Sequence, residues 1–139
     1  MIMTQEQKDI LLQDLCGRLP YGVKARVYNH WRDEFQEETI TIENLHQLIK
    51  TFSIGDIKPY LFPLASMSEE QKKECFKGTP LEIDKYGDVA VKDDFYGNSQ
   101  YTNLEIYLEV IDWLNKNHFD IYGLFHKGLA IDCTNLNIY

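Results

Sequence analysis

The stretch 101-YTNLEIYLEVIDWLNKNHFDIYGLFHKGL-129 decides the expected architecture, because its signals for the start, the faces and the end of a helix agree. Thr102 and Glu105 have the spacing of a capping box, in which each side chain accepts a hydrogen bond from the other residue's backbone N–H. Apolar side chains then recur at helical spacing in two adjacent rows, Leu104, Tyr107, Leu108, Ile111 and Leu114 in one and Ile106, Val110 and Trp113 in the other. Because only a narrow polar stripe remains, the pattern predicts a central helix over residues 102–117 that is packed from two sides.

A tight corner and a second, shorter helix are expected to follow. Asn117 tolerates the left-handed conformation that ends many helices, so the central helix should end near Asn117 and His118. Asp120 is placed to cap a short helix over residues 121–127, which Gly128 would end. Residues 129–133 alternate again and predict a last strand, and the tail after them is expected to be loose at its end.

The first half of the chain predicts one helix followed by short strands. Thr4 and Gln7 form a second capping box, and residues 4–17 have the apolar face of a helix that Gly17 would end. Residues 23–30 alternate with a period of two, which is typical of a strand. We expect a polar loop over residues 32–38 and a β-branched strand over residues 39–42.

The segment over residues 45–52 has helical spacing but also favours extension, and we interpret it as a third strand. A turn near residues 53–57, a short helix that Ser66 or Ser68 opens and a hairpin over residues 81–91 complete the pattern. The fold class is therefore expected to be α+β, with a small antiparallel meander resembling an SH3-like barrel in the first half. We expect one domain over residues 1–139, with a possible subdivision into 1–65 and 66–139.

The composition limits where the protein is expected to be located and which partners it is expected to bind. The net charge is −8, of which −2 lies in residues 1–60 and −6 in the remainder, so direct nucleic-acid binding is disfavoured. Neither a run of eighteen apolar residues nor a signal peptide is present, and the three cysteines are an odd number without paired spacing. These features indicate a cytoplasmic protein without a membrane span.

Three blocks of the sequence resemble a group of small proteins encoded by phages and prophages of anaerobic gut bacteria. The blocks are LLQDLCGRLPYGVK at 11–24, DIKPYLFPLASMSEEQKKE at 56–74 and IDWLNKNHFDIYGLFHKGLAID at 111–132. The resemblance implies a mobile-element origin, action inside a bacterial host and a small α+β fold. The group has no assigned activity, so the resemblance transfers no residue role.

The cysteines and histidines show no motif of a metal site or of a catalytic pair. None of Cys16, Cys75, Cys133, His30, His46, His118 and His126 forms a C-x-x-C or a histidine pair at helical spacing. We interpret Cys16 and Cys133 as small buried hydrophobic residues. We therefore predict no catalytic residue, no metal ligand and no cofactor site.

The clustered carboxylates have a structural interpretation that is favoured over a functional one. Asp84, Asp88, Asp93 and Asp94 lack the order of a calcium loop, and aspartates are common in turns. Asp112, His118 and Asp120 could suggest an acid–base cluster, but Asp112 lies on the polar stripe and Asp120 is needed as a cap. Sequence motifs for nucleotide binding are also absent.

Aromatic residues are the remaining unusual feature. Many of them fall in expected turns and strand edges, namely Tyr28, Trp31, Phe35, Tyr60, Phe62, Tyr86, Phe95, Tyr96 and Tyr101. They could form a protein-contact surface or, equally, wrap the central helix. We expect a non-enzymatic accessory protein that binds another protein or a second copy of itself. The alternatives are an acidic mimic of nucleic acid that inhibits a host enzyme and, third, a small hydrolase.

Overall fold

The computed structural model of the protein describes residues 3–29, 31–49, 57–92 and 104–139, and for residues 46–49 it describes the backbone alone. The helices of this part are α1 (Gln5–Arg18), α2 (Ile42–Ile49), α3 (Glu69–Phe76) and α4 (Leu104–Lys116), with 3-10 turns at Leu19–Tyr21 and Leu64–Ser66. The strands are β1 (Lys24–Asn29), β2 (Glu34–Thr39), β3 (Ile57–Leu61), β4 (Leu81–Ile83), β5 (Val89–Val91) and β6 (Ile131–Asp132).

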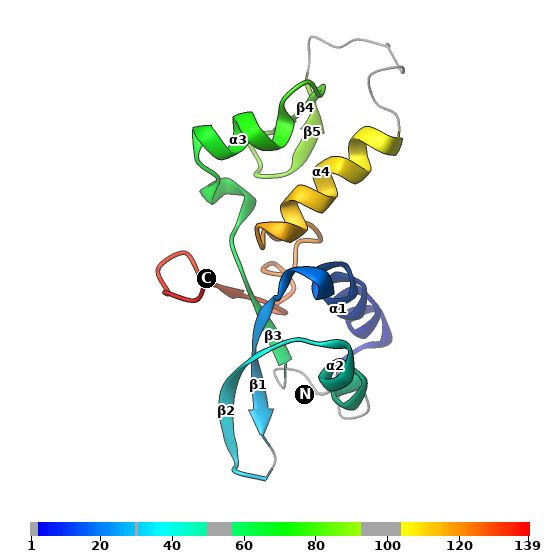
Figure 1. The fold of residues 1–139 in the computed structure, drawn as a ribbon, viewed down its shortest axis with the longest axis vertical. Coiled ribbons are helices and arrows are strands. Elements are labelled where there is room, and N and C mark those ends of the chain that lie inside the picture. Colours follow the sequence, from blue (N-terminus) through cyan, green and yellow to red (C-terminus); the bar gives the residue numbers. More distant parts are fainter. Residues whose placement is uncertain (1–2, 30, 50–56, 93–103) are drawn as a thin grey trace.

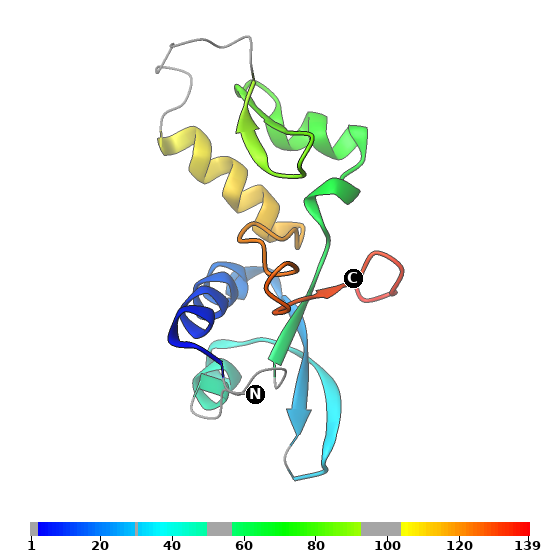
Figure 2. The same cartoon turned by 180° about the vertical axis from the view of Figure 1, so that it is seen from behind.

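Four strands form the larger sheet, in the order β2-β1-β3-β6. β1 is antiparallel to β2 and to β3, whereas β6 runs parallel to β3. Both α1 and α2 lie on the same side of this sheet (Figures 1 and 2). The first core cluster fills the space between them, with Leu11 and Leu15 of α1 against alternate strand residues such as Ala25 and Leu61.

A second core cluster joins α3, α4 and the β4–β5 hairpin at the other end of the molecule (Figure 1). Phe76 of α3, Leu81 of β4 and Leu114 of α4 are buried in it. The chain after α4 then runs back between the two clusters. Phe62 N–H donates to His118 O and Asp120 N–H donates to Phe62 O, so this returning segment pairs with the extension of β3.

The capping box predicted at Thr4 is confirmed, and of the two serines that could open the next helix the structure uses Ser68. Thr4 and Gln7 exchange side-chain hydrogen bonds at the start of α1, and Ser68 and Gln71 do the same at the start of α3. The end of α1 was predicted wrongly, because the helix continues past Gly17 to Arg18. Gly17 instead allows the Asn115 side chain of α4 to approach, since an added Cβ would lie 3.2 Å from Asn115 Nδ2.

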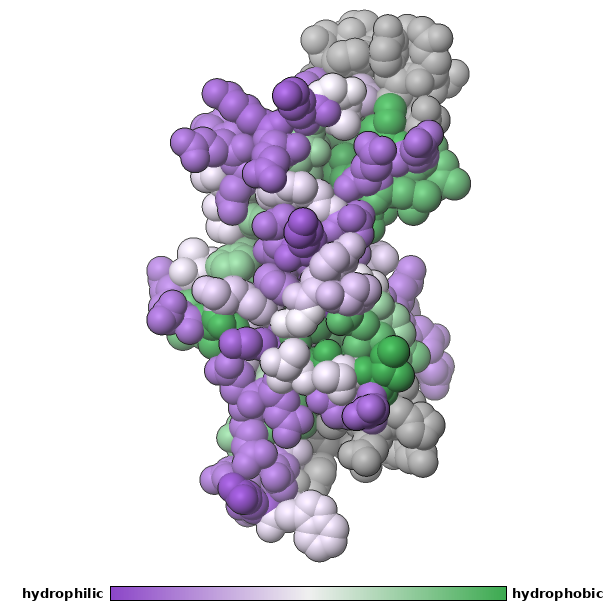
Figure 3. All heavy atoms as spheres, viewed as in Figure 1, coloured by the Kyte–Doolittle hydropathy of each residue, from purple (hydrophilic) through white to green (hydrophobic). Residues whose placement is uncertain are grey.

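The central helix is confirmed over Leu104–Lys116, and its predicted cap at residues 101–103 lies outside the described residues. Its end is also confirmed, since His118 takes φ of 64° and Phe119 N–H donates to Leu114 O. The prediction of packing from two sides is wrong for the first turns, where Leu104 is 71% and Leu108 is 55% exposed. Figure 3 shows the apolar surface that gathers over α4.

The short helix predicted over residues 121–127 is wrong, because this segment forms turns. Asp120 does act as a cap, since its carboxylate accepts from Leu124 N–H at 2.9 Å and from Phe125 N–H at 3.2 Å. Gly123 takes φ of 69°, which is incompatible with a helix continuing through it.

The predicted loop at 32–38 and strands at 39–42 and 45–52 are also wrong within the described residues. Glu34–Thr39 is β2, the hairpin partner of β1, and Ile42–Ile49 is α2. Thr41 and Asn44 form a reciprocal cap that starts α2. Ile57–Leu61 is a strand that was not predicted, and residues 50–56, with most of the expected turn, lie outside the described part.

The architecture is mixed α+β, as predicted, but the described strands do not close into a barrel. The predicted hairpin and last strand are confirmed as β4–β5 and β6. The C-terminal tail is not loose, because Tyr139 OH accepts from Lys24 N–H at 2.9 Å and donates to Tyr60 O at 2.9 Å. Its ring also stacks on His118, with ring centroids 3.7 Å apart.

Candidate protein-contact site

The β1–β2 hairpin extends away from the rest of the molecule (Figure 1), and its turn presents an indole to solvent. Trp31 is 99% exposed. The turn behind it is held by Asn29, whose Oδ1 accepts from Trp31 N–H at 2.9 Å and from Arg32 N–H at 3.2 Å. Asn29 Nδ2 in turn donates to Gln36 Oε1 at 3.1 Å. The hairpin therefore fixes the backbone of Trp31 while leaving its side chain without cover.

A pair of aromatic rings lies next to this turn, on β1 and β2. The rings of Tyr28 and Phe35 meet edge to face with centroids 5.2 Å apart, and the Arg26 guanidinium lies 4.4 Å from the centre of the Phe35 ring. Phe35 remains 50% exposed. We call Trp31, Phe35, Tyr28 and Arg26 the hairpin contact site. Exposed Trp and Arg next to aromatic rings are the residue types that dominate protein–protein hot spots.

The other aromatic residues singled out in the sequence divide between surface and core. Tyr86 is 75% exposed in the β4–β5 turn. Phe62 contacts Phe119 and Tyr139, and Phe119 stacks on Trp113 of α4. Part of the aromatic set is thus exposed and part is packed near the end of α4, and Phe95, Tyr96 and Tyr101 lie outside the described residues.

The structure gives each member of the suspected acid–base cluster its own partner. Asp112 accepts a hydrogen bond from Tyr21 OH, and this bond raises the pKa of Tyr21. Asp120 caps the turn after it, and His118 stacks on Tyr139. Burial, helped by the charge of Arg18, lowers the pKa of His118 to about 4. His118 is consequently neutral near pH 7 and is not a proton donor there.

The β4–β5 turn is stabilised by an aspartate side chain, as predicted. Asp84 Oδ1 accepts from Tyr86 N–H at 2.9 Å and from Asp88 N–H at 3.0 Å. Asp88, Asp120 and Asp132 also border a hollow of about 430 Å³ near His126. Among the described residues, no group of three or more His, Cys, Asp or Glu side chains is arranged to hold a metal ion. Asp93 and Asp94 lie outside this part.

The cysteines differ from one another in exposure. Cys75 and Cys133 are buried, and burial raises their pKa values to about 12 and about 11. Cys133 therefore fits its interpretation as a small buried hydrophobic residue. Cys16 was predicted wrongly, because it is exposed on α1. His30 and the His46 side chain lie outside the description, so the structure does not place them.

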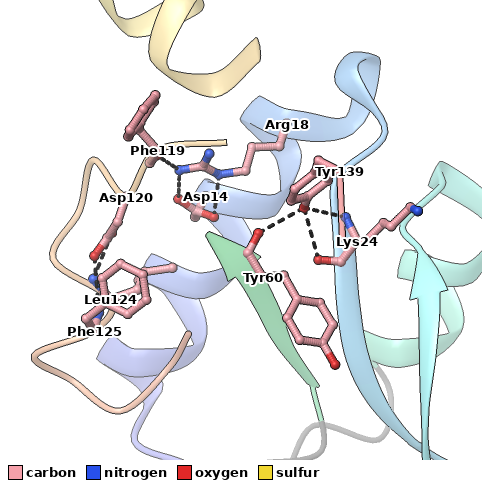
Figure 4. A network of polar contacts seen from close by, with 9 residues as sticks. All are labelled: Asp14, Arg18, Lys24, Tyr60, Phe119, Asp120, Leu124, Phe125 and Tyr139. Carbon is pink, nitrogen blue, oxygen red and sulfur yellow. Dashed lines mark hydrogen bonds and ion pairs between the residues drawn. The ribbon is translucent and has the colours of Figure 1, made fainter. Parts of the chain in front are cut away.

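Sequence reasoning missed the buried ion pair that lies between the two core clusters. Arg18 Nε and Nη2 each donate to Asp14 at 2.9 Å, and both side chains are fully buried (Figure 4). Arg18 Nη2 also donates to the carbonyl of Phe119, 101 residues away in the chain. The available signal was a pair of opposite charges four residues apart on an otherwise apolar helix face.

Sequence reasoning also missed a basic groove between α3 and β4. Its lining includes Lys72, Lys73, Lys77 and Lys92, and its volume is about 750 Å³. The net charge of the second half of the chain is negative, so composition alone did not indicate this local excess of lysine.

Comparisons with known proteins give one weak similarity. The chain is 24% identical over 156 residues to the "Deoxynucleoside triphosphate triphosphohydrolase SAMHD1 homolog" of Dictyostelium discoideum. The match covers 94% of this chain but spans only 30% of that relative's length. No protein-family model and no solved structure matches the chain significantly. No helix in the described segments combines the length and apolar character that crossing a membrane would need.

Proposed function

We propose that the protein is an accessory factor, encoded by a phage or another mobile element, that acts in the bacterial cytoplasm by binding a partner protein through the hairpin contact site. The observation that carries this proposal is Trp31, an indole 99% exposed on a turn that Asn29 holds in place. A large exposed aromatic side chain has no stabilising task in the free protein. In a complex it buries a large area at a low cost in conformational entropy.

The charges around the tip indicate what the partner surface should contain. Arg32 and Asp33 follow Trp31 with opposite charges, and Arg26 is engaged with the Phe35 ring. β2 adds Glu34, Glu37 and Glu38, of which Glu37 lies 3.7 Å from Lys24. A complementary partner therefore offers an apolar pocket for the indole with basic side chains along one rim. The proposed mode of action needs no catalytic group in this chain.

A Trp31→Ala variant tests the proposal, with Tyr86→Ala as the matched control. Both side chains are largely exposed aromatic residues, and they lie in different hairpin turns, Trp31 between β1 and β2 and Tyr86 between β4 and β5. Because Trp31 is almost fully exposed, its removal should change the free energy of unfolding by less than about 0.5 kcal/mol. Loss of a central tryptophan anchor should weaken the complex by about 2 kcal/mol or more, which is roughly thirtyfold in Kd.

The measurement starts with retention of proteins from bacterial lysate on immobilised wild-type protein and on the two variants. A partner that binds wild type and Tyr86→Ala but not Trp31→Ala is then purified, and its Kd is measured by calorimetry. If Trp31→Ala retains every partner with unchanged Kd, the hairpin contact site is not the binding surface.

The similarity to the Dictyostelium protein favours a second candidate, which is hydrolysis of deoxynucleoside triphosphates. The similarity is weak and covers less than a third of that relative. The exposed indole of Trp31 is therefore stronger support for protein binding than this similarity is for hydrolysis. Incubation with the four deoxynucleoside triphosphates and a divalent cation, followed by chromatography of the products, decides between them. Nucleoside release above that of a protein-free blank would favour the hydrolase.

The acidic mimic of nucleic acid is the remaining alternative. It requires carboxylates spaced like phosphates along one face and a partner whose binding weakens steeply with salt. Partner binding that depends on Trp31 and changes little with salt would exclude it.

A further inference from the structure

The groove between α3 and β4 is a positively charged feature in an acidic protein. Four lysines and two glutamates, Glu69 and Glu82, line it, whereas the whole chain has a net charge of −8. Glu69 pairs with Lys72 at 3.3 Å. Elsewhere in the described part of the chain, no carboxylate lies within ion-pair distance of Lys73 or Lys77. These two ammonium groups are therefore available to an anionic ligand.

One wall of the groove is β4, whose backbone has an open edge. Asp84 N–H donates to Asp88 O and Lys92 N–H donates to Pro80 O, so the even-numbered residues of this segment face β5. The backbone groups of Leu81 and Ile83 consequently point away from β5. Leu81 N–H is taken by Thr79 Oγ1 at 3.2 Å. Among the described residues, nothing bonds to the Leu81 carbonyl or to the N–H and carbonyl of Ile83.

The groove follows this open edge. Leu81, Glu82 and Ile83, which are consecutive residues, all line it. Successive side chains of a strand point to opposite faces, so a hollow across one face would be lined by alternate residues only. A hollow lined by three residues in a row therefore reaches the backbone of the strand as well as its side chains. α3 forms another wall, and Lys92 after β5 is also on the lining.

We propose that this groove binds an extended acidic peptide segment of a partner protein, which adds a third strand to the β4–β5 sheet. The backbone of the peptide satisfies the open groups of Leu81 and Ile83, and its carboxylates meet Lys73 and Lys77. These lysines are four residues apart, which is about 6 Å along a helix axis, and alternate residues of an extended chain are about 6.6 Å apart. For a peptide that runs along α3, glutamates at alternate positions match the lysine spacing.

A peptide fits this groove better than a nucleic acid does. A strand edge offers alternating N–H and carbonyl groups in one plane, and a second amide backbone satisfies both in register. A phosphate chain would use the lysines but leave the N–H and carbonyl pattern of β4 unmatched. The site is separate from the hairpin contact site and does not depend on the function proposed for it.

The experiment uses the full chain and a fluorescein-labelled eight-residue peptide of alternating glutamate and valine, followed by fluorescence anisotropy at low salt. The Lys73→Glu/Lys77→Glu variant should bind this peptide about tenfold more weakly. Lys116→Glu/Lys127→Glu is the matched control, because it makes the same change in net charge at two exposed lysines outside the groove lining. The control should bind within about twofold of wild type.

Strand addition is tested by changing the peptide, because the protein itself then stays unaltered and its folding is not affected. Two peptides carry N-methyl groups on alternate residues, one on each edge of the extended chain. Only one edge faces β4, so one peptide should lose binding at least tenfold and the other should keep it. Equal binding of both peptides would overturn strand addition, because attraction by charge alone does not distinguish the two edges.

Three further results would also overturn the proposal. The first is no saturable binding of the acidic peptide up to millimolar concentration. The second is equal binding of a single-stranded oligonucleotide of the same charge. The third is a wild-type oligomer in sedimentation that the Lys73→Glu/Lys77→Glu variant dissociates, which would make the occupant a second copy of this chain.

Discussion

Replacing Arg18 by methionine is expected to destabilise the protein severely, because it leaves a carboxylate buried without its cation. Asp14 and Arg18 are both fully buried, and two hydrogen bonds of 2.9 Å join them (Figure 4). The same guanidinium donates to the carbonyl of Phe119. Arg18 thus ties the end of α1 to the segment that returns between the two core clusters. Methionine replaces the apolar part of the Arg18 side chain but has none of its donors.

The magnitude follows from these contacts. Breaking one partner of a buried ion pair costs about 3 to 5 kcal/mol, and leaving the carbonyl of Phe119 without a donor adds about 1 kcal/mol. For a chain of this length, 1 kcal/mol corresponds to roughly 4 °C in Tm, so the Arg18→Met variant should melt about 16 to 24 °C below wild type. A loss of this size is comparable with the whole stability of many domains.

The double variant Asp14→Leu/Arg18→Met separates charge burial from packing. It removes both charges, and replacing a complete buried pair by apolar side chains is often close to neutral. It should therefore recover at least about 2 kcal/mol relative to Arg18→Met. Urea unfolding followed by tryptophan fluorescence and far-UV circular dichroism measures the cycle. If the effects of the two single substitutions simply add in the double variant, the reasoning about an uncompensated charge is refuted.

The pH dependence of the Arg18→Met variant gives a second readout of the same charge. Burial raises the pKa of Asp14 above its ordinary value of 3.8, while the charge and hydrogen bonds of Arg18 oppose the rise. Without Arg18 the pKa rises further, so above about pH 4 the folded variant holds a proton that the unfolded chain has released. The deficit in stability relative to wild type should therefore be smallest in acid and should grow as the pH rises.

Two further predictions concern His118 and the cysteines. Since burial lowers the pKa of His118 to about 4 from 6.5, the unfolded chain takes up its proton first, and stability should fall as the pH drops from 6.5 to 4. His118→Asn, which tolerates the positive φ there, should show a smaller fall over this window in urea titrations, and an equal fall would contradict the assignment. A thiol reagent should modify one cysteine, Cys16, in the folded protein and all three after unfolding, as counted by mass spectrometry. Rapid modification of Cys75 or Cys133 in the folded state would contradict their burial.

The elements predicted correctly from the sequence are those whose signals lie within a few residues. The capping boxes at Thr4 and Ser68 fix where α1 and α3 begin, because each box is made by side chains only three residues apart. The central helix has the same advantage over most of its length. Its exposed leucines were not predictable, because periodicity marks an apolar face and does not say whether another element covers it.

The errors occur where tertiary pairing decides the outcome. The segment Glu34–Thr39 is polar because it is an edge strand with little core to face, and it extends because β1 lies beside it. α2 begins at a reciprocal cap that uses Asn44 in the place where glutamate or glutamine is usual, so its signal was weak. At Gly123, one positive φ converts an expected helix into turns.

The candidate sites were only partly predictable for a related reason. Trp31 belonged to the aromatic set marked from the sequence, but so did Phe62, which packs against Phe119. Composition does not separate these two environments. The basic groove was hidden because net charge averages over the surface, whereas the potential at a groove depends on the few side chains that line it.

One edge strand of each sheet lies among charges of opposite sign, and this difference affects whether two copies of the chain can associate. β2 carries Glu34, Glu37 and Glu38 at the edge of the larger sheet, and β4 faces the lysines of α3 at the edge of the smaller one. Charged side chains on an edge discourage pairing with a like-charged strand and permit pairing with an oppositely charged one. Contact between β2 of one copy and β4 of the next would join different surfaces, and such contacts continue into filaments unless they close into a ring. A wild-type protein that stays monomeric at low salt would therefore show that β2 of one copy does not pair with β4 of another, and that opposite charge alone does not join the two edges.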